Sequence, residues 1–237
     1  MQNTERQSPF KREVSRAEKQ AKAVMVSLTL LKQSLEKDNV GEALDSAVDF
    51  AYEAERLTLL ARELVAYTGH PQANKLINQV ISDSIPIRIG FTNEGWFGVV
   101  IPALLPKKQK GSVDFIREPL YIAMKDFFKG KNPVRYTDCF LIYRHVYRRD
   151  RPERRYRDHD NIEVNAVTDI IALYVLFDDS PLCCSHLYCS AAGDENRTEV
   201  YVVPQFELSA WFSAMKSNGS KGVILHENIL KTSKKHT

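Results

Sequence analysis

The first third of the chain repeats its apolar residues at helical spacing. Between residues 21 and 35 they lie three or four positions apart, and between residues 43 and 64 they alternate four and three, which gives a narrow seam suited to a partner helix. Gly69 and Pro71 end the second run. The pattern predicts an antiparallel helical hairpin. We expect its seam to pack within the chain and to make some dimer contact, because two helices alone bury little core.

In the rest of the chain, short runs of branched and aromatic residues indicate strands. Residues 85–91 and 96–101 flank a tight turn and predict a β-hairpin. Residues 112–127 predict a helix, with Pro119 either in its first turn or at a kink. Residues 134–147 are apolar on both faces, which predicts a strand in the centre of its sheet.

A further helix is predicted to begin at a capping box formed by Asp160 and Glu163. Two closing strands, at 182–190 and 198–203, are joined by a turn at residues 193–196, and a short helix follows them. The fold class is therefore α+β, a mixed sheet with packed helices that follows the helical hairpin. The expected divisions are residues 1–78, 79–205 and a C-terminal extension, 206–237.

The composition is that of a globular protein: of 237 residues, 43% are hydrophobic and 27% are charged. No run approaches the roughly 18 apolar residues that a membrane span requires. The first apolar stretch follows a long charged segment, which argues against a signal peptide. We therefore expect a cytoplasmic protein outside membranes, whose four cysteines are reduced thiols.

The formal net charge is only +3, which argues weakly against a dedicated nucleic-acid binder. The basic residues are nevertheless unevenly placed: an arginine-rich loop follows the long strand, and a lysine loop follows the β-hairpin. Such clusters favour contacts with phosphates. The expected nucleic-acid-binding residues are Arg148, Arg149, Arg151, Arg154, Arg155, Arg157, Lys107 and Lys108.

Two pairs of aspartates lie at the two ends of the helix that follows this loop. Asp158 and Asp160 stand at its start and Asp178 and Asp179 follow its far end, with the apolar run 170–177 between the pairs. If the chain folds back so that the pairs converge, oxygen ligands of this kind suit Mg²⁺ or Mn²⁺. Such a centre is the usual apparatus for hydrolysing a phosphodiester. The alternative is that Asp160 caps the helix and that the second pair forms an exposed turn.

Thiols and histidines offer two other possibilities. Four residues close in sequence are of zinc-ligand type: Cys183, Cys184, His186 and Cys189. They lack the paired spacing of a structural zinc site, so buried thiols and a satisfied histidine are the favoured interpretation. His145 and His159 could act as general bases. His159 lies between two aspartates, and we interpret it as structural or as a phosphate contact.

The segment Arg157-Asp158-His159-Asp160-Asn161, its helix and the turn Asp178-Asp179-Ser180-Pro181 together resemble the core motif of the RusA-type Holliday-junction resolvases. In that family an Asp-x-Asp-Asn segment and an Asp-Asp turn bind Mg²⁺ in a dimeric α/β enzyme. The resemblance covers roughly residues 85–205. It implies a homodimer that acts on branched DNA. It also implies that Asp158, Asp160 and Asp179 are catalytic metal ligands, with Asp178 as a further ligand.

One departure from the family pattern concerns its catalytic lysine, which would fall at Val164 here; the family's further helical aspartate would fall at Thr168. Loss of a basic group that stabilises the transition state could abolish turnover and spare binding. Two functions therefore stay open. One is a divalent-metal-dependent, structure-selective DNA endonuclease of DNA recombination. The other is a catalytically inactive RusA-like accessory factor of a mobile element, which binds nucleic acid or protein. A third possibility is a protein partner bound through residues 21–68.

Overall fold

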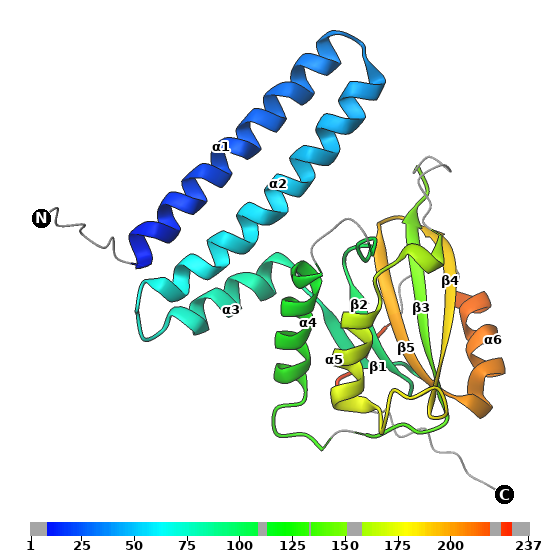
Figure 1. The fold of residues 1–237 in the computed structure, drawn as a ribbon. Helices are drawn as coiled ribbons and strands as arrows, with labels where there is room; N and C mark the ends of the chain where they lie inside the picture. Colours follow the sequence, from blue (N-terminus) through cyan, green and yellow to red (C-terminus); the bar gives the residue numbers. More distant parts are fainter. Residues whose placement is uncertain (1–8, 109–112, 133, 151–157, 219–223, 229–237) are drawn as a thin grey trace, which may run out of the picture. The chain divides into compact units, whose positions relative to one another are not determined.

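The computed structural model of the chain describes residues 9–108, 113–132, 134–150, 158–218 and 224–228 (Figure 1). The chain divides into two compact units, Met1–Val80 and Ile81–Thr237. Among the described residues, no helix is both long enough and apolar enough to cross a membrane.

The first unit contains the predicted antiparallel helical hairpin. Its helices, α1 (Pro9–Glu36) and α2 (Val40–Tyr67), have 28 residues each and pack side by side (Figure 1). Asn39 caps α2, because its side-chain oxygen accepts a hydrogen bond of 3.2 Å from the backbone N–H of Glu42. A third helix, α3 (Ala73–Ser84), is not predicted by the sequence pattern. It begins two residues after Pro71, where the pattern predicts the end of helical structure.

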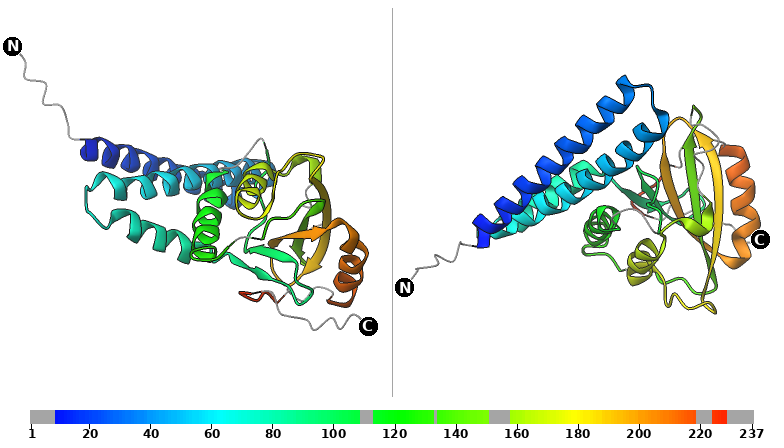
Figure 2. Two further views of the ribbon diagram at one scale, coloured as in Figure 1. Left: turned by 90° about the horizontal axis from the view of Figure 1, so that it is seen from below. Right: turned by 45° about the horizontal axis from the view of Figure 1, so that its top comes forward.

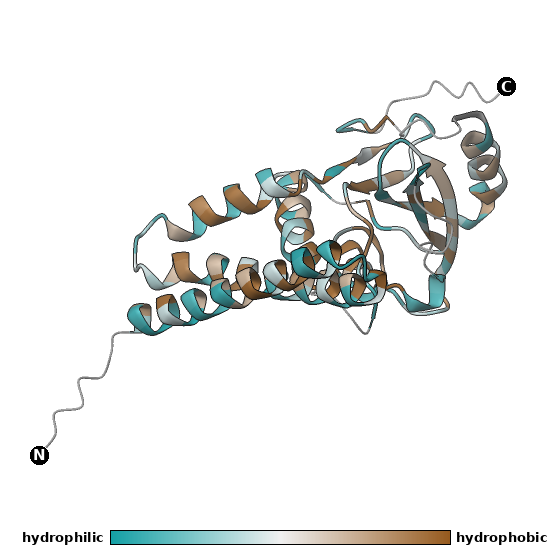
Figure 3. Ribbon diagram, turned by 90° about the horizontal axis from the view of Figure 1, so that it is seen from above, coloured by the Kyte–Doolittle hydropathy of each residue, from teal (hydrophilic) through white to brown (hydrophobic). Residues whose placement is uncertain are grey.

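The most buried positions of α1 are polar, and apolar residues beside them, such as Val24 and Leu31, are half-buried. No residue of α2 is buried. The buried residues of α1 recur every seven positions along the helix: Glu13, Gln20, Ser27 and Ser34. The side-chain amide of Gln20 donates to the carbonyl oxygen of Glu53 at 3.0 Å and also to the Glu53 carboxylate. Many apolar side chains on both helices are exposed, and Figure 3 shows hydrophobic positions distributed along both helices.

The second unit is built on a five-stranded mixed sheet with the strand order β1-β2-β5-β3-β4. Only the β3–β4 pair is parallel, and the other pairs are antiparallel. The strands are β1 (Arg88–Phe91), β2 (Phe97–Ile101), β3 (Cys139–Arg148), β4 (Cys184–Gly193) and β5 (Arg197–Pro204). The predicted hairpin β1–β2 and the central strand β3 are confirmed. The two closing strands are also present, but they do not pair with each other, because β3 lies between them.

Helices cover both faces of the sheet (Figures 1 and 2). The main core lies under α4 (Asp114–Phe127) and α5 (Asn165–Val175), which contribute Leu120 and Ile171 among others. Pro119 lies inside α4 and is buried there. A smaller core on the opposite face packs Tyr201 and Ile142 under Trp211 of α6 (Leu208–Asn218). A helix between the parallel strands β3 and β4 is the expected crossover connection.

A buried charge network lies on the face that carries α6. Glu199 is fully buried, and its carboxylate accepts hydrogen bonds of 2.7 Å from Arg144 and 2.7 Å from Arg197. The hydroxyl of Tyr201 donates a third, of 2.8 Å. A carboxylate removed from water is stable only when its oxygens are satisfied in this way.

Two glycines allow the segment Ile224–Asn228 to approach the sheet closely. Phe91 and His226 exchange backbone hydrogen bonds of 2.8 Å in both directions. A Cβ atom on Gly90 would lie 2.6 Å from the carbonyl oxygen of His226, and one on Gly98 would lie 2.8 Å from the Leu225 side chain. At position 90 only glycine leaves room for the backbone of the segment as it lies, whereas at position 98 a larger residue would require the Leu225 side chain to move.

Candidate functional site

The first aspartate pair lies in a turn before α5. Residues His159–Asn161 form a short 3-10 helix, and Asp158 and Asp160 are exposed. The predicted capping box is wrong, because α5 begins only at Asn165, after Val164. The Glu163 carboxylate instead accepts a hydrogen bond of 2.9 Å from the backbone N–H of Asn165.

Helix α5 begins late because residues 161–163 pair with the lysine loop, residues 106–108. The backbone N–H of Lys108 donates to the carbonyl of Asn161 at 3.0 Å, and that of Glu163 donates to the carbonyl of Pro106 at 2.9 Å. These bonds hold the chain extended between the 3-10 turn and α5, with Lys107 opposite Ile162. Two exposed lysines therefore lie beside the Asp158–Asp160 turn, although some 50 positions separate the two segments in the sequence.

Aromatic and polar side chains of the sheet lie under the turn. The His159 ring nitrogen Nε2 is 3.0 Å from Oγ of Ser190 on β4. The ring centroid of His159 is 5.9 Å from that of His145 and 6.0 Å from that of Tyr188. The side chains of His186, Tyr188 and Ser190 on β4 therefore lie on the face of the sheet that is covered by α5 and by the Asp158–Asn161 turn. Sequence reasoning missed Tyr188 and Ser190, whose only signal was this alternation.

Tyr143 connects the sheet to the start of α5. Its hydroxyl lies 2.8 Å from that of Thr168 and donates to the Val164 carbonyl at 3.3 Å. Burial raises the pKa of Tyr143 well above its ordinary value, so the phenol stays neutral. Val164 is only 5% exposed and belongs to the main core. The position where the resemblance expects a lysine is therefore apolar and closed to solvent.

The second aspartate pair lies at the other end of α5. The backbone N–H of Phe177 donates to the carbonyl of Tyr136 at 2.9 Å, and Arg135 donates to the carbonyl of Leu176 at 2.7 Å. Asp178 and Asp179 therefore follow a segment held near the start of β3, whereas the first pair lies near its far end. A hydrogen bond from Ser180 lowers the pKa of Asp178.

The two pairs do not meet, because the 11 residues of α5 alone span about 16 Å. No three histidine, cysteine, aspartate or glutamate side chains among the described residues are grouped so that they could hold a metal ion. As they lie, the four carboxylates do not fit one Mg²⁺ or Mn²⁺ centre, and their role as metal ligands stays a prediction.

Arg148, the last residue of β3, and Arg149, which follows it, lie at the same end of the sheet as the first aspartate pair. The N–H of Arg149 donates to the Gly193 carbonyl at 3.0 Å, and that of Arg148 donates to the Asn196 side chain at 3.1 Å. Both side chains are more than half exposed and reach nearby acids, Asp150 and Asp194. The predicted contacts Arg151, Arg154, Arg155 and Arg157 lie outside the described residues.

Two cysteines form a pair inside the sheet. Cys139 and Cys184 are buried and directly opposite each other on β3 and β4. The neighbouring Cys139 thiol, together with His186, lowers the pKa of Cys184, and the presence of Cys184 beside it raises the pKa of Cys139. All four cysteines are free thiols.

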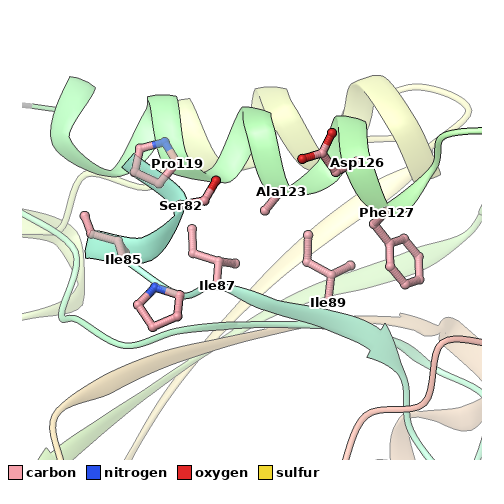
Figure 4. A pocket seen from close by; sticks show the side chains of 9 residues that line it. Ser82, Ile85, Ile87, Ile89, Pro119, Ala123, Asp126 and Phe127 are labelled. Carbon is pink, nitrogen blue, oxygen red and sulfur yellow. The ribbon is translucent and has the colours of Figure 1, made fainter. Parts of the chain in front are cut away.

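A separate cavity of about 310 Å³ lies between β1 and α4 (Figure 4). Most of the side chains that line it are apolar, with Ser82 and Asp126 as polar members. The apolar ones come from α4, from β1 and from the segment just before β1: Ile85, Pro86, Ile87, Ile89, Pro119, Ala123 and Phe127. None of the predicted site residues lines it.

Comparison with known proteins identifies a family and nothing closer. Residues 5–229 match the model of a family described as a family of unknown function (DUF6100). The search of curated proteins and the search of solved structures gave no match.

Proposed function

We propose that this chain, a member of the family of unknown function DUF6100, is a nucleic-acid-binding accessory factor on a RusA-like scaffold, carried by a mobile element, which holds branched DNA without cutting it. The observation that carries this proposal is Val164. A buried valine, hydrogen-bonded through its carbonyl to Tyr143, stands where the resolvase motif requires a catalytic lysine. The separation of the two aspartate pairs by α5 points the same way.

The binding surface is the end of the sheet where the lysine loop, the Asp158–Asn161 turn and the end of β3 lie. Lys107 and Lys108 are exposed there and held by backbone pairing, and the side chains of Arg148 and Arg149 are more than half exposed. Exposed cations on fixed backbone bind phosphates and release their counterions, which makes binding weaken as salt rises.

The test is binding of a fluorescently labelled four-way DNA junction, followed by anisotropy over a salt series with Mg²⁺ and with EDTA. We expect binding that falls steeply with salt and is the same with and without Mg²⁺. The double variant Lys107→Ala/Lys108→Ala should lower the slope of log K against log salt by about one for each lysine that binds a phosphate. Arg154→Ala and Arg155→Ala should also weaken binding.

The matched control is Lys125→Ala/Lys129→Ala, because these lysines are also exposed but belong to α4 and the residues just after it. That variant should bind like the unchanged protein. An equal loss of affinity in both double variants would show that only net charge matters. No binding to any branched, duplex or single-stranded DNA by the folded protein would overturn the proposal.

A second candidate function is the divalent-metal-dependent endonuclease. One observation favours it: the lysine loop brings Lys107 and Lys108 beside Asp158 and Asp160, so a basic group lies near the first acidic pair even without a lysine at position 164. Nicking of a four-way junction in Mg²⁺ or Mn²⁺, abolished by Asp160→Asn and by Lys108→Ala, would establish this function and overturn the first.

A further inference from the structure

The outer edge of β4 is an open edge of the sheet. β4 is the last strand in the order β1-β2-β5-β3-β4, so β3 is its only neighbour among the described strands (Figure 1). The backbone N–H of Cys139 donates to the carbonyl of Cys183, and that of Arg149 donates to the carbonyl of Gly193. Alternate residues make the bonds of a parallel pair, so the odd-numbered residues of β4 bind β3 and the backbone groups of the even-numbered residues point outwards.

These outward backbone groups have no partner within the described part of the chain. That holds for the N–H and carbonyl groups of His186, Tyr188 and Ser190. Proteins usually protect such an edge with charged residues, a proline, a bulge or a short strand, because it pairs readily with another strand. β4 has none of these devices. Its ten residues contain no Asp, Glu, Lys, Arg or Pro, and they pair with β3 in an unbroken register.

The opposite edge of the sheet is protected. Strand β1 has only four residues, one of which is Arg88. Its outer side carries residues 224–228, where His226 exchanges backbone hydrogen bonds with Phe91. The chain therefore covers its short, charged edge and leaves the long, uncharged edge without any segment that the structure describes. Such an edge fits a ligand that is itself a strand and supplies the matching backbone groups.

A second copy of β4 supplies these groups when it lies antiparallel to the first. With a two-fold axis at Tyr188, this residue pairs with Tyr188 of the other copy, and His186 pairs with Ser190. Each pair consists of two residues whose backbone groups point outwards, so these are the hydrogen-bonded pairs of an antiparallel ladder. Two identical strands can approach in this way because β4 carries no charged residue that would repel its own copy.

The side chains on both faces of β4 fit the same register. On the face that carries α5, Tyr188 lies beside its own copy, and His186 lies opposite the hydroxyl of Ser190. On the face that carries α6, the half-buried Leu187 lies opposite Cys189. Aromatic pairs and polar pairs of this kind stabilise neighbouring strands. A surface that complements itself under a two-fold rotation is an isologous interface.

We infer that the outer edge of β4 is the docking surface for a second copy of this chain, whose β4 continues the sheet antiparallel about Tyr188. The two sheets then form one continuous sheet. The interface uses none of the residues that bind nucleic acid in the proposed function, so it goes beyond that function and does not depend on it. Because the two strands are antiparallel, the two nucleic-acid-binding surfaces lie at opposite ends of the joined β4 strands.

The mass of the full-length protein in solution, measured by light scattering at about 100 μM, tests the dimer. The unchanged protein should have twice its 27.1 kDa chain mass. His186→Lys/Ser190→Lys changes two exposed side chains and places two ammonium groups opposite each other at two points of the interface. It should raise the dissociation constant about tenfold. The matched control is His186→Lys/Ser190→Glu, which places lysine opposite glutamate at the same points and should remain dimeric. Circular dichroism checks that both variants are folded.

A cysteine placed opposite the native Cys189 tests the register without any change of charge. Residues 187 and 189 form a pair without backbone hydrogen bonds, whose Cα atoms lie about 4.5 Å apart in an antiparallel ladder. Leu187→Cys should therefore form a disulfide-linked dimer when oxidised glutathione is added. Leu187→Cys/Cys189→Ser should not. Ser185→Cys lies on the same face but about 7–8 Å from Cys189 of the other copy, so it should not cross-link either.

Amide hydrogen exchange distinguishes a second copy from other strands at this edge. The N–H groups of residues 186, 188 and 190 should exchange slowly in the dimer and rapidly in His186→Lys/Ser190→Lys. Slow exchange in a monomeric protein would show that another segment of the same chain covers the edge, and it would overturn the inference. A monomeric unchanged protein with rapid exchange, equal weakening by the two double variants, or cross-linking at position 185 instead of 187 would overturn it as well. A dimer that passes these tests but binds no DNA leaves this interface standing without the proposed function.

Discussion

The hydroxyl of Tyr143 on β3 donates a hydrogen bond of 3.3 Å to the carbonyl oxygen of Val164, and the hydroxyl of Thr168 lies 2.8 Å away. Val164 and Thr168 are the two positions at which the resolvase resemblance expects a lysine and an aspartate. A neutral, buried cluster thus occupies the place where the resemblance requires charge.

This cluster predicts the effect of restoring the family residue. Val164→Lys should destabilise the fold by several kcal/mol and should not create nuclease activity, because position 164 is 5% exposed and lies among the apolar residues of the main core. Tyr143→Phe should cost about 1–3 kcal/mol, because it removes the hydroxyl that lies 2.8 Å from the buried Thr168 hydroxyl, whereas the Val164 carbonyl keeps the backbone N–H groups of Val167 and Thr168 as donors. Chemical denaturation measures both, with Tyr67→Phe as an exposed control. A Val164→Lys variant that is as stable as the unchanged protein would contradict the buried placement.

The two aspartate pairs should differ in their effect on DNA binding. Asp160→Asn removes a negative charge beside Lys107 and Lys108, so junction affinity should rise by about 1 kcal/mol at low salt. Asp178→Asn, at the other end of α5, should leave the affinity unchanged. Anisotropy titrations measure the difference. If both substitutions have the same effect, the acids act together and the separation seen in the fold is wrong.

Stability at high pH should depend on a half-buried tyrosine, Tyr136. Burial raises the pKa of Tyr136 to about 12, from an ordinary value of 10.0. Between these values the unfolded chain loses this proton and the folded chain keeps it. The stabilisation is therefore complete below pH 10 and is lost as pH rises towards 12. The melting temperature should fall over this range, and the fall should be shallower in Tyr136→Phe. A slope that is identical in the two proteins would exclude this tyrosine as a cause.

The buried network around Glu199 should be sensitive to removal of one charge. Glu199→Gln leaves Arg144 and Arg197 without their shared carboxylate, and we expect a loss of about 3–5 kcal/mol in unfolding free energy. Asp150→Asn is the comparison, because the Arg148–Asp150 pair is 59% and 64% exposed and should contribute less than about 1 kcal/mol. Urea denaturation distinguishes the two cases.

The two glycines under the segment Ile224–Asn228 should respond differently to alanine. At Gly90 the new Cβ atom meets a backbone carbonyl at 2.6 Å, so Gly90→Ala should displace the segment. At Gly98 the new atom meets only the end of the Leu225 side chain, at 2.8 Å, which can turn away. Hydrogen exchange at Phe91 and His226 should rise strongly in the first variant and little in the second. Adding Leu225→Ala should remove the effect at Gly98 alone.

Local patterns in the sequence predict most of the elements but not their pairing. The helical hairpin, the β1–β2 hairpin and the central strand β3 all follow from periodicity, which reports what each segment buries. Periodicity says nothing about strand neighbours, so it does not predict that β3 separates β4 from β5. The pattern also misses the helix α3, because Pro71 indicates the end of helical structure as readily as a turn before another helix.

At the candidate site, too, the sequence predicts which residues matter but not which segments pair. Residue types identify Asp158, Asp160 and the lysine loop, and the structure places these together. That proximity depends on backbone bonds between residues 106–108 and 161–163, for which the sequence holds no local signal. The same bonds delay the start of α5 to Asn165 and so defeat the predicted capping box.

The position of β5 has a consequence for biosynthesis. This strand is the last in the sequence, yet it fills the middle of the sheet between β2 and β3. Until residues 197–204 have left the ribosome, the hairpin β1–β2 and the β3–α5–β4 crossover have no strand to join them. The first unit can fold while the chain is still being made, but the second must wait until residues 197–204 have been made, with apolar faces of β2 and β3 exposed in the meantime.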